Sequence, residues 1–89
     1  MPVRVATICN QLGLHARAAA AFVRFSTAFD CDIHVACQDI EVDGKSIMGV
    51  MMLAARMGAQ IRIRAEGSDA EQAVEQLAQL VANRFGEEK

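Results

Sequence analysis

The chain has 89 residues, 53% of them hydrophobic, and its formal net charge is −2 at pH 7. This length predicts a single domain, residues 1–89, with one hydrophobic core. The composition is too apolar for a disordered chain, and the small charge argues against a nucleic-acid-binding protein. No apolar run approaches the ~20 residues of a membrane span, so we expect a cytosolic protein without membrane insertion.

The first two thirds of the chain predict a strand, a helix, two strands and a second helix, in that order. Residues 3–9 are strand-like, and residues 16–28 carry apolar side chains at helical spacing. Residues 32–37 and 40–43 have the alternation of two short strands, which predicts a hairpin. The apolar stretch that follows is typical of a helix from Ile47 to about Met57, ended by Gly58.

The last third predicts one strand and one helix. Residues 60–66 alternate apolar and polar side chains, and Ser68 with Glu71 forms a capping-box signal for the final helix. Helical spacing puts these residues in the core: Ala70, Ala73, Val74, Leu77, Leu80 and Val81. The terminal GEEK segment should fray. The order βαββαβα predicts an α+β, open-faced two-layer sandwich, a four-stranded, mostly antiparallel sheet covered on one face by three helices.

Three cysteines make an odd count, which favours free, buried thiols in a reducing compartment. The stretch CDIHVAC, residues 31–37, resembles a metal-ligand cluster. As a strand, however, it directs Cys37 and His34 to opposite faces, whereas zinc needs converging ligands. We therefore expect no metal site and no cofactor; a metal or redox domain would instead carry zinc or a disulfide.

His15 lies at the start of the first predicted helix, in the stretch GLHARA. The free backbone N–H groups of Ala16, Arg17 and Ala18, with the helix dipole, would form an anion cradle and favour a neutral imidazole. The Arg17 guanidinium suits phosphate oxygens, and Gly13 eases the turn. This pattern fits a histidine that accepts and passes on a phosphoryl group. It also fits a solvated cap histidine beside a surface arginine.

The helix predicted after Ser46 is apolar nearly all round, unlike a surface helix. We assign Val50, Leu53, Ala54 and Met57 to its core side. Met48, Met51, Met52 and Ala55 then face outward, with Ile47 on the border. Such a methionine-rich face is typical of a docking surface for several partners, although self-association would also cover it.

Ser46 is well placed to cap this helix. A phosphate on its hydroxyl would be stabilised at the helix N-terminus and would bring about two negative charges into the apolar surface. Ser46 is therefore either a plain cap or the position of a regulatory switch.

The motifs GLHARA at 13–18 and GKSIMGVMMLAA at 44–55 together resemble the HPr family, the histidine phosphocarriers of the bacterial phosphoenolpyruvate-dependent phosphotransferase system. The resemblance covers essentially the whole chain. It implies that enzyme I phosphorylates His15, that Arg17 steadies the phosphoryl group, and that an enzyme IIA-type protein accepts it. It also implies that HPr kinase/phosphorylase modifies Ser46 in lineages that have that enzyme.

The resemblance further implies a docking surface and a covalent carrier that is not an enzyme. We expect a monomer, because the apolar surface must remain free for transient partners. Its docking residues would be Arg24, Ile47, Met48 and Met51. HPr proteins usually have proline where this chain has Ala18, and we expect phosphoryl acceptance to survive because alanine is an excellent helix former. The combination of HARA with the later VMMLAA resembles the variants found in proteobacteria. The alternative hypothesis is a regulatory binding protein that uses the Met48 and Met51 surface without phosphotransfer.

Overall fold

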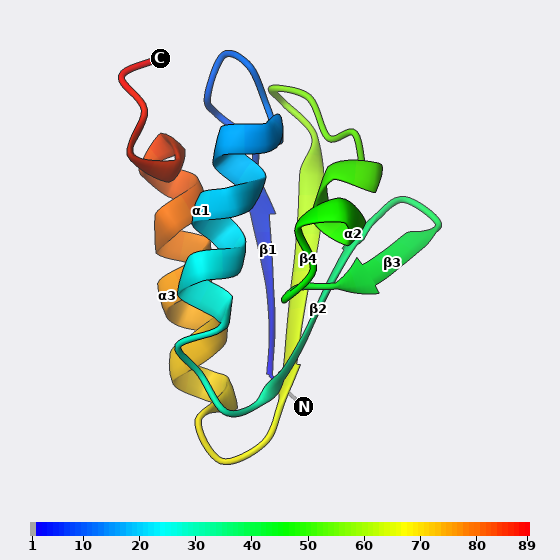
Figure 1. Cartoon of the computed structure of the whole chain (residues 1–89), viewed down its shortest axis with the longest axis vertical. Helices are drawn as coiled ribbons and strands as arrows, with labels where there is room; N and C mark the ends of the chain where they lie inside the picture. Colours follow the sequence, from blue (N-terminus) through cyan, green and yellow to red (C-terminus); the bar gives the residue numbers. More distant parts are fainter. Residues whose placement is uncertain (1) are drawn as a thin grey trace.

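A four-stranded sheet forms one layer of the computed structural model, which describes residues 2–89 (Figure 1). Its strands are β1 (Val3–Thr7), β2 (Asp32–Cys37), β3 (Ile40–Asp43) and β4 (Gln60–Glu66). They lie in the order β1-β4-β2-β3, and every neighbouring pair is antiparallel. The first strand of the chain therefore pairs with the last one.

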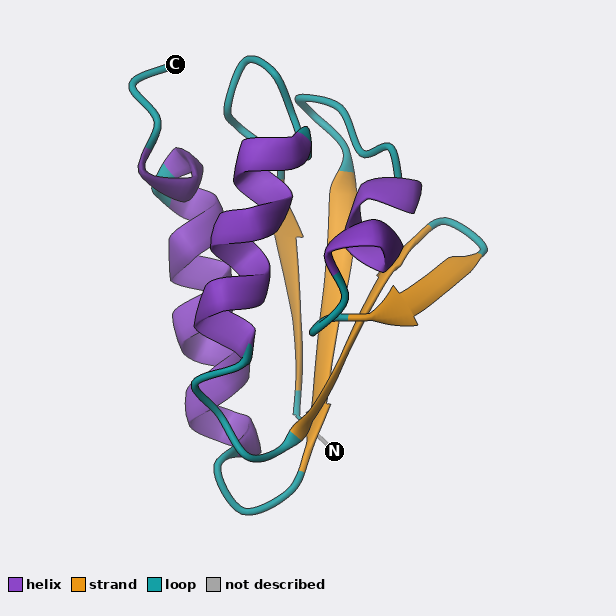
Figure 2. Ribbon diagram, viewed as in Figure 1, coloured by secondary structure: helices purple, strands orange, loops and turns teal. Residues whose placement is uncertain are grey.

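The second layer consists of helices (Figure 2). These are α1 (Ala16–Ser26), α2 (Ile47–Met52) and α3 (Ala70–Ala82), and a short 3₁₀ turn, η1 (Arg84–Gly86), follows α3. In β4, Ile61 and Ile63 are fully buried against this layer, whereas Arg62 on the opposite face is exposed. The predicted α+β sandwich with the order βαββαβα is confirmed.

The core lies between the sheet and the helices. Phe22 of α1, Val35 of β2 and Leu77 of α3 are fully buried in it. The six apolar positions predicted for the final helix are all buried: Ala70, Ala73, Val74, Leu77, Leu80 and Val81. The helical periodicity thus correctly predicted the buried face of the final helix.

The predicted length of the second helix is wrong, because α2 ends at Met52. Ala54 has a positive φ of 50°, so the chain turns and its side chains leave the helical pattern. As a result Ala54 and Met57 are exposed rather than in the core, and Ala55 is buried rather than outward. Two other predicted core residues, Val50 and Leu53, are buried.

The predicted capping box of the final helix is also wrong. Asp69, not Ser68, is the N-cap of α3, and it makes no side-chain cap hydrogen bond. Its carboxylate instead accepts hydrogen bonds from the backbone N–H groups of Asp30 and Cys31, both at 3.0 Å. Asp69 therefore ties the loop before β2 to the start of α3.

The three cysteines are free thiols, but they differ in burial. Cys31 and Cys37 are buried, as predicted, whereas Cys9 is exposed, so the prediction is wrong for that residue. His34 is half-buried on the opposite side of β2 from Cys37. Across residues 2–89, no cluster of three or more metal-ligating side chains forms, and no helix is long and apolar enough to cross a membrane.

Candidate functional site

His15 is the N-cap of α1, as its position in the sequence predicted. Its backbone is extended, with φ −76° and ψ −179°, and its carbonyl accepts the hydrogen bond of Ala19 N at 2.9 Å. The N–H groups of Ala16, Arg17 and Ala18 precede this first intrahelical bond. They belong to the part of a helix that has no intrahelical acceptor, next to the positive end of the helix dipole.

The loop before His15 is held against the chain that follows α2. Leu14 N donates to Ala55 O at 2.9 Å. Ile8 N donates to Ala59 O at 2.8 Å, and Ile8 O accepts from Gly58 N at 2.6 Å. Gly13 has a φ of 69°, and a Cβ on it would lie 2.5 Å from Ala55 O. This position therefore needs glycine both for its backbone conformation and for the close approach.

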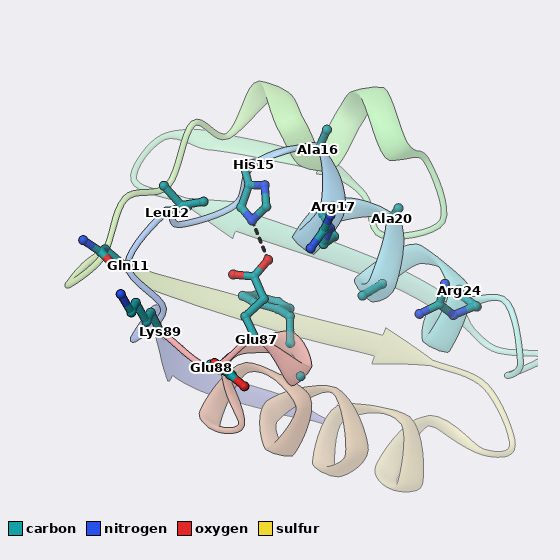
Figure 3. Close-up of a pocket in the computed structure, with 13 residues that line it drawn as sticks. Gln11, Leu12, His15, Ala16, Arg17, Ala20, Arg24, Glu87, Glu88 and Lys89 are labelled. Carbon is teal, nitrogen blue, oxygen red and sulfur yellow. Dashed lines mark hydrogen bonds and ion pairs between the residues drawn. The ribbon is translucent and has the colours of Figure 1, made fainter.

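The chain end folds back onto His15, so the prediction that the terminal segment frays is wrong at Glu87. His15 Nε2 and Glu87 Oε2 are 2.5 Å apart, and Asn10 Nδ2 donates to Glu87 Oε1 at 2.9 Å (Figure 3). Phe85 is buried and anchors the turn that precedes Glu87. Burial of this aromatic side chain explains why the segment folds back rather than frays.

The environment of Glu87 favours its ionised form. The Glu87 side chain is 15% exposed and that of His15 is 29% exposed. Partial burial by itself raises the pKa of the Glu87 carboxyl, but hydrogen bonds from Asn10 and His15 outweigh that effect, together with the positive charge of Arg17. The net result is a pKa below the ordinary value for glutamate.

A pocket lies between α1 and the chain end, and it contains both arginines predicted for the site. It is lined by His15, Arg17 and Arg24 from one side and by Glu87 and other terminal residues from the other (Figure 3). Arg17 and Arg24 are exposed. Arg24 therefore lines the same pocket as His15. The family resemblance implied that Arg24 belongs to a docking surface together with residues of α2.

The three residues of the predicted anion cradle, Ala16, Arg17 and Ala18, differ in exposure. Ala16 and Arg17 are exposed, whereas the Ala18 side chain is fully buried in the core. Only the backbone of Ala18 can therefore contribute to an anion site. The alanine methyl group fits into the core at this position.

Ser46 is the N-cap of α2, as predicted, and its Oγ accepts a hydrogen bond from Gly49 N at 3.1 Å. Four apolar side chains after it are exposed, and we call them the α2 patch: Ile47, Met48, Met51 and Met52. Met48 is the most exposed of them at 76%. α2, the helix that carries the patch, contacts α1, whose N-cap is His15 (Figure 1).

Two residues of the site were not predicted, Asn10 and Glu87. Asn10 is fully buried and also donates through Nδ2 to Gly13 O at 2.8 Å, so it braces the turn before His15. Asn10 belongs to a glycine-bearing turn, where asparagine commonly makes local hydrogen bonds, and this could have marked it. Glu87 is 72 residues from His15, and no spacing rule links the two.

Comparisons with known proteins agree on one family. A family model described as the PTS HPr component phosphorylation site matches residues 3–83. Phosphocarrier protein HPr of Pseudomonas putida is 49% identical over 88 residues, 98% of each chain, and that of Cupriavidus necator is 45% identical over 94% of each chain. The crystal structure of HPr-C-His from Thermoanaerobacter tengcongensis matches with a TM-score of 0.94 and 40% identity over all of both chains.

Proposed function

Because the chain belongs to the HPr family of phosphocarrier proteins, we propose that His15 is the residue that carries the phosphoryl group. The observation that supports this most directly is the position of His15 as the N-cap of α1. The imidazole is partly exposed, beside free N–H groups that can receive phosphate oxygens. A shallow site of this kind can hold a phosphoryl group and still release it to the next acceptor.

The chemistry of this proposal requires only one nucleophile. A neutral imidazole nitrogen donates its lone pair to phosphorus and forms an N–P bond, while the bond between phosphorus and the donor breaks and its electron pair remains on the donor. The N–H groups of Ala16, Arg17 and Ala18 and the Arg17 guanidinium then face the three phosphoryl oxygens. The reverse sequence, with a new acceptor, discharges the carrier.

We further propose enzyme I as the donor and enzyme IIA-type proteins as acceptors. The α2 patch supports a docking role because soluble domains rarely expose neighbouring large apolar side chains without a partner. Ile47, Met48 and Met51 would pack against the partner, and flexible methionines suit a surface shared by several proteins. Arg24, which lines the His15 pocket, would supply charge at the edge of that interface.

We assign a regulatory role to Ser46, as the substrate of an HPr kinase/phosphorylase where that enzyme is present. Its support is the position of the hydroxyl at the N-terminus of α2, directly before Ile47 and Met48. A phosphate there would add about two negative charges to an apolar docking surface. Docking of a partner through that surface would then have to desolvate the charge, which opposes binding.

The test of the carrier role is incubation with phosphoenolpyruvate and the cognate enzyme I. We expect an acid-labile phosphate on the wild-type chain and none on His15→Ala. His34→Ala is the matched control because it removes the other histidine, which lies in β2. Absence of label in the wild type, or label retained in His15→Ala, would end the proposal for His15.

The regulatory role is tested by the rate at which His15 is phosphorylated in Ser46→Asp and Ser46→Ala. Aspartate can still cap α2 but adds charge, whereas alanine removes the cap without adding charge. We expect a slower rate in Ser46→Asp than in Ser46→Ala. If both variants retain the wild-type rate, Ser46 serves only as a helix cap.

The exposed α2 patch also favours a second candidate, a regulatory binding protein with no phosphotransfer role. In that case the patch would bind its partner equally well whether or not His15 is present, and no phosphate would appear on the chain. We propose a cytoplasmic monomer in either case. Three free thiols suit a reducing compartment, and a patch shared by transient partners must stay open.

A further inference from the structure

A second pocket borders the chain segment that supports the loop before His15. One of its walls is the β2–β3 turn, and the other is the chain that follows α2, from Leu53 to Ala59 (Figure 1). Its volume is about 320 Å³, at the small end of the roughly 300–1,000 Å³ typical of sites for small molecules. The functions proposed above leave this pocket unused.

The lining of this pocket is apolar apart from two side chains. Cys37 and Leu53 are buried, and Ile40 is exposed. Arg56 and Gln38 are also exposed and supply the polar side chains. A concave, mostly apolar surface with a few polar groups is the usual form of a small-molecule site.

The charge of Arg56 has no partner in the fold. Among residues 2–89, Arg56 forms no ion pair, whereas Arg4 and Arg64 each pair with a glutamate. Of the same residues, none that lines the pocket is acidic, and Asp39 in the β2–β3 turn is exposed without lining it. A guanidinium can bind a carboxylate through two parallel hydrogen bonds. The pocket therefore offers a place for one carboxylate beside an apolar surface.

Both walls contain a residue in a strained backbone conformation. Gln38 has a φ of 55° and Ala54 a φ of 50°, values that non-glycine residues rarely adopt. Hydrogen bonds hold both residues: Arg62 donates to Gln38 O at 2.9 Å, and Ala54 N donates to Met51 O at 3.0 Å. Strained residues of this kind cluster at functional sites and ligand clamps. Their presence on both walls favours a binding role over an accidental gap.

We propose that this pocket binds a small carboxylic acid with an apolar chain. The carboxylate pairs with the guanidinium of Arg56, and the apolar chain lies against Cys37, Leu53 and Ile40. The exposed amide of Gln38 is available for a further polar group on the ligand. The site is separate from the pocket of His15, and the proposal does not rest on the function proposed for that residue.

A ligand in this pocket would also stabilise the loop before His15. Ala55 and Ala59 line the pocket, and their carbonyls accept hydrogen bonds from Leu14 N at 2.9 Å and Ile8 N at 2.8 Å. A ligand that binds only when this segment is in place shifts the equilibrium against its local opening. Binding should therefore be detectable at Leu14 and Ile8, which do not line the pocket.

The first experiment is a titration of the ¹⁵N-labelled chain with hexanoate, followed by the amide resonances. Hexanol lacks the charge and acetate lacks the apolar chain, so both serve as control ligands. We expect hexanoate to shift the resonances of residues 37–40 and 53–59 until they saturate, and both controls to bind more weakly. No saturation with hexanoate, equal binding of hexanol, or shifts confined to the pocket of His15 would overturn the proposal.

The role of Arg56 is tested by Arg56→Gln, with Arg4→Gln as the matched control. Both arginines are exposed, but Arg4 lies in β1, at the opposite edge of the sheet from β3, and its surface ion pair contributes little to stability. Loss of a charge-assisted hydrogen bond should weaken hexanoate binding roughly tenfold in Arg56→Gln. Arg4→Gln should bind like the wild type. Equal affinities for all three proteins would refute the assigned carboxylate position.

A final pair of measurements addresses the loop and the competing occupant. With saturating hexanoate, amide hydrogen exchange should slow more at Ile8 and Leu14 than at Leu77 in α3; uniform slowing would refute the link to the loop. Spectra recorded without hexanoate at rising protein concentration test whether a second copy fills the pocket. We expect no change, and concentration-dependent shifts of residues 37–40 and 53–59 would overturn the proposal.

Discussion

Gly13→Ala should destabilise the protein and slow phosphoryl acceptance together, because Gly13 positions the turn that leads into His15. The residue has a φ of 69° and its Cβ position lies 2.5 Å from Ala55 O and 3.0 Å from Arg56 Cα. Both neighbours are backbone atoms, so they cannot rotate away as a side chain would. The new methyl group must push the loop or the segment after α2.

The magnitude has two parts. A non-glycine residue in the left-handed region costs roughly 1–2 kcal/mol, and forcing an extra methyl group into a packed site costs about 1–3 kcal/mol. The free energy of unfolding should therefore fall by about 3 kcal/mol. At roughly 4–8 °C per kcal/mol for a domain of this size, the melting temperature should fall by about 12–24 °C.

Gly58→Ala provides the matched control. Gly58 also has a positive φ, 95°, but a Cβ there would meet no atom within 4 Å. This variant carries the conformational cost without the overlap, so its free energy of unfolding should fall by roughly 1–2 kcal/mol. The difference between the two variants measures the close approach of Gly13 to Ala55.

Urea unfolding followed by far-UV circular dichroism is the appropriate assay, since the chain has no tryptophan or tyrosine for fluorescence. The rate of His15 phosphorylation is measured on the same samples under conditions in which each variant is folded. We expect a slower rate in Gly13→Ala only. Equal stabilities for Gly13→Ala and Gly58→Ala would refute the reasoning, because the overlap would then have no energetic consequence.

Three further outcomes are expected. Hydrogen bonds from the backbone of Asp30 and from Cys31 hold the pKa of Asp69 below its ordinary value of 3.8, so the ionised carboxylate stabilises the fold above that pH. As the pH falls further, the unfolding free energy of the wild type should decrease more steeply than that of Asp69→Asn. Parallel curves for the two proteins would contradict this. Burial, with a hydrogen bond to Asp69 and the charge of that carboxylate, raises the pKa of Cys31 to about 11, so iodoacetamide at pH 8 should alkylate exposed Cys9 first and Cys31 only after unfolding, as peptide mass spectrometry can verify. Light scattering should give the monomer mass of 9.6 kDa, although a Thermoanaerobacter tengcongensis relative was crystallised as an HPr dimer; twice that mass would show self-association.

The sequence was most informative where a pattern persisted over several turns or residues. The alternation of residues 60–66 and the helical spacing of residues 70–81 correctly predicted β4, α3 and their buried faces. Ser46 was correctly placed as an N-cap, and His15 was correctly placed at the start of α1, because helix starts have local signals. These features depend on interactions within one element.

The failures concern contacts between distant segments. No glycine or proline marks the end of α2 at Met52; the backbone turns at Ala54, and the next residue receives a hydrogen bond from Leu14 N. Glu87 reaches His15 only because the chain folds back after α3. Local propensity carries no information about either arrangement, since tertiary contacts override it.

The hydrogen bonds between the loop before His15 and residues 55–59 have a consequence for biosynthesis. The first segment of the site to be made, residues 8–15, finds its partners only after residue 59 has been synthesised, and Glu87 comes last of all. Contacts of such large sequence separation form late and slowly during folding. A growing or partly folded chain therefore has the histidine but not the geometry around it. With the function proposed for His15, only folded chains would therefore accept a phosphoryl group efficiently.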